Sequence, residues 1–149
     1  MPDNGLPDQA IVNDFDSLHD GMTAVLDWRV DAADIDGFAA LSGDRNPLHM
    51  DPDFARSRGF VDRVAHGFLL GAKVSAVVGM ILPDRDCLIL EQTLAYPKPI
   101  HPGDHIRIEG EVSELSAEQR IVKVRIRAHR LTDDAKTLVA RGYVLCRNQ

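Results

Sequence analysis

The sequence predicts an α+β domain in which an antiparallel β-sheet is wrapped around a long central apolar helix. Residues Gly67–Leu82 are apolar on nearly every side of a helical wheel, so we expect this helix to be surrounded by protein. Four strand-like segments follow it and are joined by short turns, the arrangement of an antiparallel sheet. The length of 149 residues suits one domain and is too small for two separate cores.

The chain begins with a polar stretch that precedes the first strand pattern. Residues 1–20 include Pro2 and other turn-forming residues, so we expect a loosely structured N-terminal segment, followed by a single domain over residues 21–149. Apolar and polar side chains alternate over Thr23–Val30, which indicates a half-buried strand.

Two helices are predicted between this strand and the apolar helix. Asp31 is a typical N-cap for a helix that continues to Ser42 and is stopped by Gly43. The pair Asp51-Pro52 combines a cap with a first-turn proline and opens a short helix that ends before Gly59.

The remaining strands follow the apolar helix. They are expected at Cys87–Tyr96, Ile106–Val112, Val122–His129 and Thr137–Arg147. The last of them is apolar on both faces, so it is buried on both sides or meets another subunit. Because one wrapped sheet covers its helix with a single face, we expect a homodimer of twofold symmetry.

Composition and charge exclude several classes of function. The 17 Lys and Arg residues against 23 Asp and Glu residues give a net charge of −6, so we expect no nucleic-acid partner. The apolar run Phe68–Leu82 is 15 residues long, too short to span a membrane. Cys87 and Cys146 have no CxxC spacing, and the first residues show neither a secretion signal nor an anchor. We expect reduced thiols in a cytoplasmic protein.

The segment Leu41–Ala55 holds the strongest candidates for catalysis. Asp44 and His49 are separated by Pro47, which interrupts a regular helix and forces Asn46 into extended geometry. A fully extended spacer would hold them roughly 17 Å apart, whereas a bend at the proline brings them closer. A carboxylate and an imidazole that converge can hold a water molecule and exchange protons with it. Turn capping and a loop histidine are the alternatives that the motif alone leaves open.

A second candidate region lies where the apolar helix begins. Its first backbone N–H groups face whatever precedes the helix, and such a terminus stabilises a developing negative charge. Gly67 permits close approach of a ligand, next to His66. Ser75 lies about two turns further along the helix. A plain helix start, and a serine hydroxyl bonded to the preceding turn, are the structural alternatives.

These residues carry a family resemblance. The strings Phe38–His49 (FAALSGDRNPLH) and Ala65–Leu70 (AHGFLL), at this interval, resemble the MaoC-like, (R)-specific enoyl-CoA hydratase family. The similarity extends from about Leu18 to the end and includes the loop Pro97–Asp104.

The resemblance implies a hot-dog fold and reversible syn addition of water to a trans-2-enoyl thioester. It implies no metal and no cofactor, and it implies that the acyl group of the substrate is carried as a thioester by CoA or by acyl carrier protein. Asp44 and His49 match the catalytic pair of the family, and Gly67 the backbone N–H that binds the thioester oxygen. Asn46 and Ser75 match further site positions, and His66 joins them as a candidate substrate contact.

Three competing interpretations remain at the level of sequence. A metal site built from Asp44, His49 and His66 matches no common ligand spacing. A hot-dog acyl thioesterase shares the fold and the substrate handle, but it needs a differently placed acid or base. A non-catalytic acyl-binding subunit is the third. Lys73 departs from the family pattern, since relatives carry an apolar side chain there, which bears on the length and polarity of the acyl chain.

Overall fold

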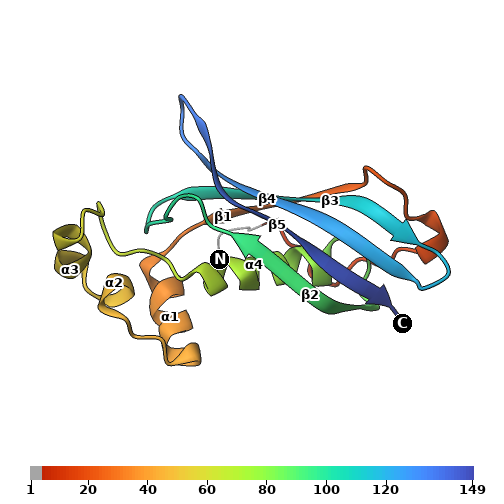
Figure 1. The fold of residues 1–149 in the computed structure, drawn as a ribbon, viewed down its shortest axis with the longest axis horizontal. Coiled ribbons are helices and arrows are strands. Elements are labelled where there is room, and N and C mark those ends of the chain that lie inside the picture. Colours follow the sequence, from red (N-terminus) through yellow and green to blue (C-terminus); the bar gives the residue numbers. More distant parts are fainter. Residues whose placement is uncertain (1–4) are drawn as a thin grey trace.

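The computed structural model describes residues 5–149, so Pro2 lies outside the described residues. Within this part of the chain, five antiparallel strands form one sheet in the order β1-β3-β4-β5-β2. The sheet curves over a single helix, α4, as Figure 1 shows. The predicted α+β class and the hot-dog arrangement are therefore confirmed. The strands are β1 Thr23–Arg29, β2 Cys87–Ala95, β3 His105–Ser116, β4 Ile121–Leu131 and β5 Lys136–Asn148.

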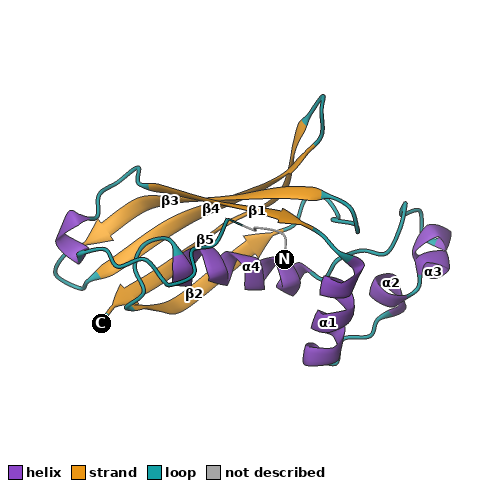
Figure 2. Cartoon of the chain, turned by 180° about the vertical axis from the view of Figure 1, so that it is seen from behind, coloured by secondary structure: helices purple, strands orange, loops and turns teal. Residues whose placement is uncertain are grey.

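The core fills the space between the sheet and α4, which spans Gly67–Met80. Alternate side chains of β3, β4 and β5 point towards the helix, and the reverse view in Figure 2 shows α4 lying along this face. From the helix, Leu70, Val74 and Val77 are at most 1% exposed. Period-2 alternation on the strands and an apolar helix thus bury each other, as the sequence predicts.

Three short helices form a cluster at the N-terminal end of α4 (Figure 1). They are α1 Ala32–Ser42, α2 Pro47–Met50 and α3 Pro52–Ser57. Asp31 and Asp34 make a capping box at the start of α1, and Gly43 ends it with a φ of 80°. The helix α2 is a difference from the sequence prediction. Asn46 is extended before the proline, as expected, but Pro47 then opens one short helical turn that carries His49.

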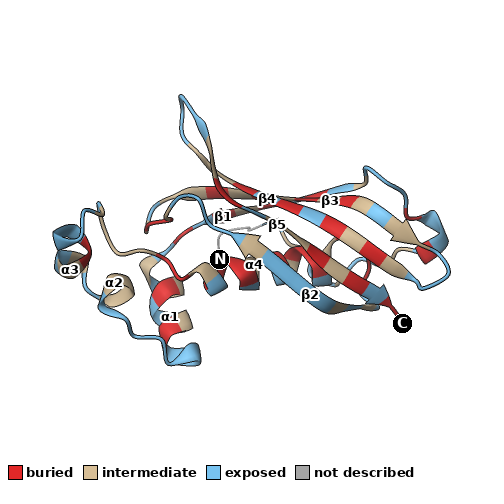
Figure 3. Cartoon of the chain, viewed as in Figure 1, coloured by how far each residue is buried: buried red, intermediate tan, exposed pale blue. Residues whose placement is uncertain are grey.

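One side of α4 is open within this chain, as expected for a single wrapped sheet that covers its helix with one face. Phe68 is 82% exposed, and Ala72, Ser75 and Gly79 follow it on the same side of the helix. The neighbouring edge strand β2 is also largely exposed, as the pale blue colour in Figure 3 shows. The apolar pattern of α4 therefore exceeds what this chain buries by itself.

The strand β5 lies inside the sheet, between β4 and β2. Val144 and Cys146 on one face are buried in the core, whereas Tyr143 and Leu145 on the other face are half-buried. Its Gly142 is required by the approach of β2, because a Cβ atom there would lie 1.7 Å from the carbonyl oxygen of Thr93. The edge of the sheet on this side is thus formed by β2 and not by the C-terminal strand.

The segment before β1 is more ordered than its composition suggests. Phe15 and Leu18 are each 7% exposed and belong to the core, and the N–H of Ile11 donates to the carbonyl of Met80 at 2.9 Å. These contacts depart from the loose structure expected over residues 1–20, since apolar side chains among the polar ones find a place at the far end of α4.

The two cysteines are unpaired, and Cys146 is buried. Burial raises the pKa of the Cys146 thiol to about 12 and that of Cys87 to about 11, so both are protonated at neutral pH. Among the described helices, none combines the length and the apolarity needed to cross a bilayer.

Candidate active site

The catalytic candidate Asp44 lies on an exposed loop between α1 and α2 that is shaped by local hydrogen bonds. The Ser42 hydroxyl accepts from the Asp44 N–H at 3.1 Å, and the Asp44 carboxylate accepts from the Asn46 N–H at 3.2 Å. Asn46 in turn caps α2, since its side chain accepts from the Leu48 N–H at 2.9 Å. Asn46 therefore shapes the turn that brings the next helix back towards Asp44.

The position and tautomer of His49 follow from its partner on the neighbouring loop. The Nδ1 of His49 lies 2.6 Å from the carbonyl oxygen of Val64. Because a carbonyl only accepts, Nδ1 carries the proton, and in the neutral ring Nε2 has a free lone pair. The carbonyl of Val64 thus leaves Nε2 of His49 available as a base.

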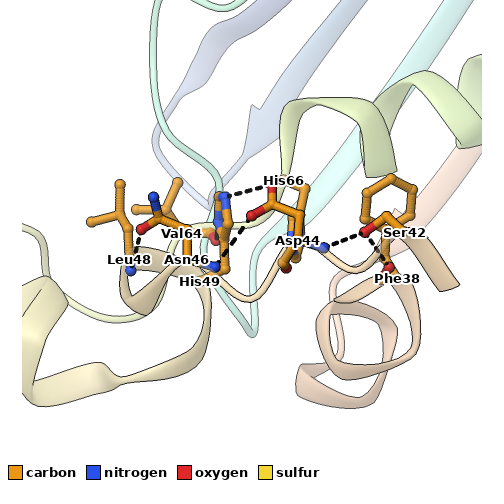
Figure 4. Close-up of polar contacts among 8 residues, drawn as sticks. All are labelled: Phe38, Ser42, Asp44, Asn46, Leu48, His49, Val64 and His66. Carbon is orange, nitrogen blue, oxygen red and sulfur yellow. Dashed lines mark hydrogen bonds and ion pairs between the residues drawn. The ribbon is translucent and has the colours of Figure 1, made fainter. Parts of the chain in front are cut away.

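Asp44 and His49 converge as the bend at Pro47 allows. The Nε2 of His49 is 3.7 Å from the Oδ2 of Asp44 (Figure 4). The His49 side chain is 16% exposed and that of Asp44 is 51% exposed, so the pair is open on the carboxylate side. This separation exceeds a direct hydrogen bond and suits one water molecule that contacts both groups.

His66 is the buried member of the cluster. It is 3% exposed, and its Nε2 donates to the backbone carbonyl of Asp44 at 2.9 Å. Its ring stacks on that of His49 with centroids 3.8 Å apart, and the centroid of the Phe38 ring is 4.9 Å from that of His66. Its Nδ1 has no hydrogen-bond partner among the described residues. The sequence predicts a substrate contact at His66, and in the structure its ring also contacts the two catalytic candidates.

Gly67 begins α4, and no side chain of the described part of the chain caps this terminus. Its N–H is one of the first-turn donors that have no partner within the helix. The ring of Tyr96 packs where a side chain at residue 67 would be, 3.0 Å from a Cβ atom built there. The Tyr96 hydroxyl donates to the Gly67 carbonyl at 2.9 Å, and burial raises the pKa of this hydroxyl, which keeps it protonated. The glycine is thus needed for contact with Tyr96 as well as for ligand approach.

A pocket of about 300 Å³ opens between these groups. His49, His66 and Gly67 line it, and most of its remaining wall is apolar. The other lining residues are Phe60, Val64, Ala65, Leu70, Tyr96, Lys98, Pro99 and Ile100. His49 and a free helix terminus therefore face one small, mainly apolar cavity, and Asp44 lies beside His49 outside the lining.

Asp44, His49 and His66 also satisfy a distance criterion for metal binding, with one ligand atom of each within 4.8 Å of the others. The two imidazole planes, however, differ by only 26° and are stacked. Nitrogen lone pairs lie in the ring plane, so stacked rings do not direct them at one point 2.0–2.1 Å from both nitrogens, as zinc requires. The geometry favours proton transfer over metal coordination.

The structure does not bring Ser75 to this pocket in the single chain. Ser75 is exposed on the open side of α4 and is absent from the lining. Lys73 also lies elsewhere, with its Nζ 5.3 Å from the centroid of the Trp28 ring. The departure at Lys73 therefore concerns the packing of β1 on α4 and not the lining of the pocket.

Sequence reasoning missed Tyr96 and Val64 as parts of the site. Tyr96 ends a strand far from the motif in sequence, and the proline after it was the only local sign that the chain turns there. Val64 contributes its backbone carbonyl, and because every residue has one, the residue type gives no sign of this role.

Comparisons with known proteins show which family the chain is similar to. A family model described as MaoC like domain matches residues 16–133. The (R)-specific enoyl-CoA hydratase of Aeromonas caviae is 39% identical over 111 residues, covering 74% of this chain and 83% of the relative. The 3-hydroxybutyryl-CoA dehydratase of Methylorubrum extorquens is 38% identical over 106 residues, covering 71% of this chain and 68% of the relative.

Solved structures show the same similarity. The (R)-hydratase from A. caviae that is involved in PHA biosynthesis superimposes with a TM-score of 0.83 at 34% identity, covering 89% of this chain and 98% of that one. An unliganded R-hydratase from Pseudomonas aeruginosa gives a TM-score of 0.82 at 33% identity, covering 90% of this chain and 84% of that one.

Proposed function

The chain belongs to the MaoC-like dehydratase family, and on this premise we propose that it is an (R)-specific hydro-lyase acting on acyl-CoA thioesters. The reaction is the reversible syn hydration of a trans-2-enoyl thioester to an (R)-3-hydroxyacyl thioester. The observation that carries the proposal is the 3.7 Å separation of His49 Nε2 and Asp44 Oδ2 beside a pocket at the start of α4.

One water molecule between Asp44 and His49 supplies both parts of the addition. His49 takes a proton from the water through Nε2 as the hydroxyl group bonds to Cβ of the enoyl chain. This proton then passes from His49 to Asp44, which delivers it to Cα on the same face. Delivery of the proton to Cα restores both groups to their starting states. The two groups act as a coupled pair, and in the dehydration direction their roles are reversed.

The negative charge that develops during addition is placed on the thioester oxygen. In the proposed mechanism this oxygen accepts from the Gly67 N–H, at the positive end of the α4 dipole. The donor is fixed before the reaction starts, because Tyr96 packs against Gly67 and bonds its carbonyl. In this mechanism Asn46 shapes the loop that carries Asp44. Ser75 contacts the site only when a second subunit is present.

The proposal is tested directly by an assay with crotonyl-CoA. We expect the absorbance of the enoyl thioester to fall and (R)-3-hydroxybutyryl-CoA to form. A thioesterase would instead release free CoA thiol, which a thiol reagent detects in the same reaction. An acyl-binding subunit would change neither signal. Release of thiol without loss of the double bond would therefore replace the hydratase proposal.

Chelation is expected to leave the activity unchanged, because no step of the proposed mechanism uses a Lewis acid. The measurement compares initial rates before and after prolonged treatment with EDTA. Activity that disappears with EDTA and returns with zinc would assign Asp44, His49 and His66 to a metal site.

We further propose that the enzyme is a homodimer. The open side of α4 exposes Phe68 to 82%, and the edge strand β2 exposes Leu88 to 56% and Leu90 to 45%. Twofold pairing would cover both surfaces and would place Ser75 in an interface close to the pocket. Light scattering at micromolar concentration should give twice the chain mass of 16.5 kDa. A mass equal to one chain would contradict this assembly.

We place the enzyme in the cytoplasm. The support for this location is the pair of unpaired cysteines, one buried and one half-buried, which suits a reducing compartment.

A further inference from the structure

The loop that carries Asp44 is weakly attached to the rest of the protein. Gly43, Asp44, Arg45 and Asn46 are all exposed. Their hydrogen bonds to Ser42, Leu48 and one another are local. Among the described residues, one hydrogen bond joins this loop to a distant segment of the chain, and it comes from the ring of His66. The position of the Asp44 backbone therefore depends on that ring.

The same ring also supports the other catalytic side chain. The faces of His66 and His49 stack at 3.8 Å, while Phe38 of α1 lies against the ring of His66 at 4.9 Å. The ring plane of His49 is thus set on one side by His66 and at its Nδ1 by the carbonyl of Val64. His66 itself is fixed, since it is 3% exposed and its backbone begins α4.

We propose that His66 is a positioning residue for the catalytic pair: its ring N–H holds the Asp44 carbonyl, and its face orients the His49 ring. This inference rests on the proposed function for its effect on rate. Its geometric part, that His66 anchors the Asp44 loop, stands on the contacts alone. Because its Nε2 bonds the carbonyl of Asp44 and its face stacks on His49, His66 acts on the pair through these two contacts, while its ring also lines the pocket. A 1 Å misplacement of a catalytic group costs about 10²-fold in rate.

Two substitutions separate the contacts of His66. His66→Phe keeps an aromatic face and loses the N–H donor, whereas His66→Gln keeps a side-chain N–H of similar reach and loses the ring. We expect His66→Phe to lower kcat about 10²-fold with little change in KM. We expect His66→Gln to recover a large part of that loss. A Gln variant no better than the Phe variant would overturn the hydrogen bond as the positioning contact.

A matched control is available in His129, on the opposite face of the sheet. Its Nδ1 lies 3.4 Å from the Oε2 of Glu109, and its side chain is 15% exposed. His129→Phe removes a largely buried imidazole without changing the Asp44 loop, so its kcat should equal that of the wild type. Near wild-type kcat in His66→Phe as well would overturn the proposal.

A double-mutant cycle distinguishes positioning from a general structural defect. In an Asp44→Asn background, His66→Phe should cause little further loss, because the group that it positions is already disabled. The same 10²-fold loss in both backgrounds would show that His66 acts independently of Asp44 and would overturn the inference.

Hydrogen exchange gives a readout that does not depend on activity. Peptides that cover residues 42–46 should exchange faster in His66→Phe and His66→Gln than in the wild type, with the greater increase in the Phe variant. Peptides from β3 and β4 should be unchanged. If the wild type hydrates no enoyl thioester, the proposed function fails and the exchange result still decides the anchoring role. Unchanged exchange over residues 42–46 in both variants would overturn that role.

Discussion

Asp44→Asn and His49→Ala are each expected to lower kcat for crotonyl-CoA by about 10²–10⁴-fold, the usual contribution of one general acid or base. The amide cannot deliver the proton that Cα requires, and alanine removes the lone pair that Nδ1 protonation leaves on Nε2. Neither side chain belongs to the core, since that of Asp44 is 51% exposed and that of His49 is 16% exposed. Their replacement should therefore leave the core intact, as circular dichroism and thermal melting would show.

The matched control for this experiment is Asp53→Asn. The side chain of Asp53 is 92% exposed on the nearby helix α3 and pairs with Arg56, so its loss should leave kcat unchanged. The double variant of Asp44 and His49 should lose much less than the product of the two single losses, because the pair shares one water molecule. Near wild-type turnover in either single variant would remove that residue from the mechanism.

Local chemistry explains why much of this fold was predictable. The cap at Asp31 and the stop at Gly43 are encoded within single helical turns, and the structure contains both. Alternation with period 2 located β1, β3 and β4 to within a few residues, since the burial of one face of a strand leaves an alternating pattern in the sequence. The approach of Asp44 and His49 to each other is also encoded locally, because the proline between them fixes the bend of the chain.

Features that depend on strand order were not predictable in this way. The approach of Tyr96 to Gly67 joins residues 29 apart, and it requires that β2 lies at the edge of the sheet next to β5. An open side of α4 was expected, because one wrapped sheet covers its helix with a single face, but the sequence did not show which residues of α4 lie on it. An apolar pattern records that a surface is buried, but it does not record whether the same chain buries it.

The contacts of His66 with the catalytic pair were not predictable, because residue type alone does not give the direction of a side chain. A histidine before a helix that faces a ligand site is a reasonable substrate contact, and His66 does line the pocket. Its Nε2 instead points back to the Asp44 carbonyl. The backbone carbonyls of Asp44 and Val64 fix the tautomers of His66 and His49, respectively. A backbone carbonyl leaves no mark in a side-chain motif.

Removal of the Gly67 N–H is expected to cost about 10²–10³-fold in kcat, the usual effect of losing one oxyanion donor. Gly67→Pro makes this change to the backbone with little cost to the helix, because proline is well tolerated at the first helical position. The residue before it already has the required extended geometry, since His66 has φ −60° and ψ 137°. Chemistry at Cβ would slow, while Asp44 and His49 would remain in place.

Gly67→Ala is the control, because it adds a Cβ atom and keeps the N–H. That Cβ would lie 3.0 Å from the ring of Tyr96, so the ring must shift slightly in the alanine and the proline variants alike. The loss that the proline variant suffers beyond the alanine variant therefore measures the missing donor. The comparison requires initial rates at saturating crotonyl-CoA and melting curves for both proteins. Equal kcat values in the two variants would mean that the thioester oxygen is stabilised by a group other than the Gly67 N–H.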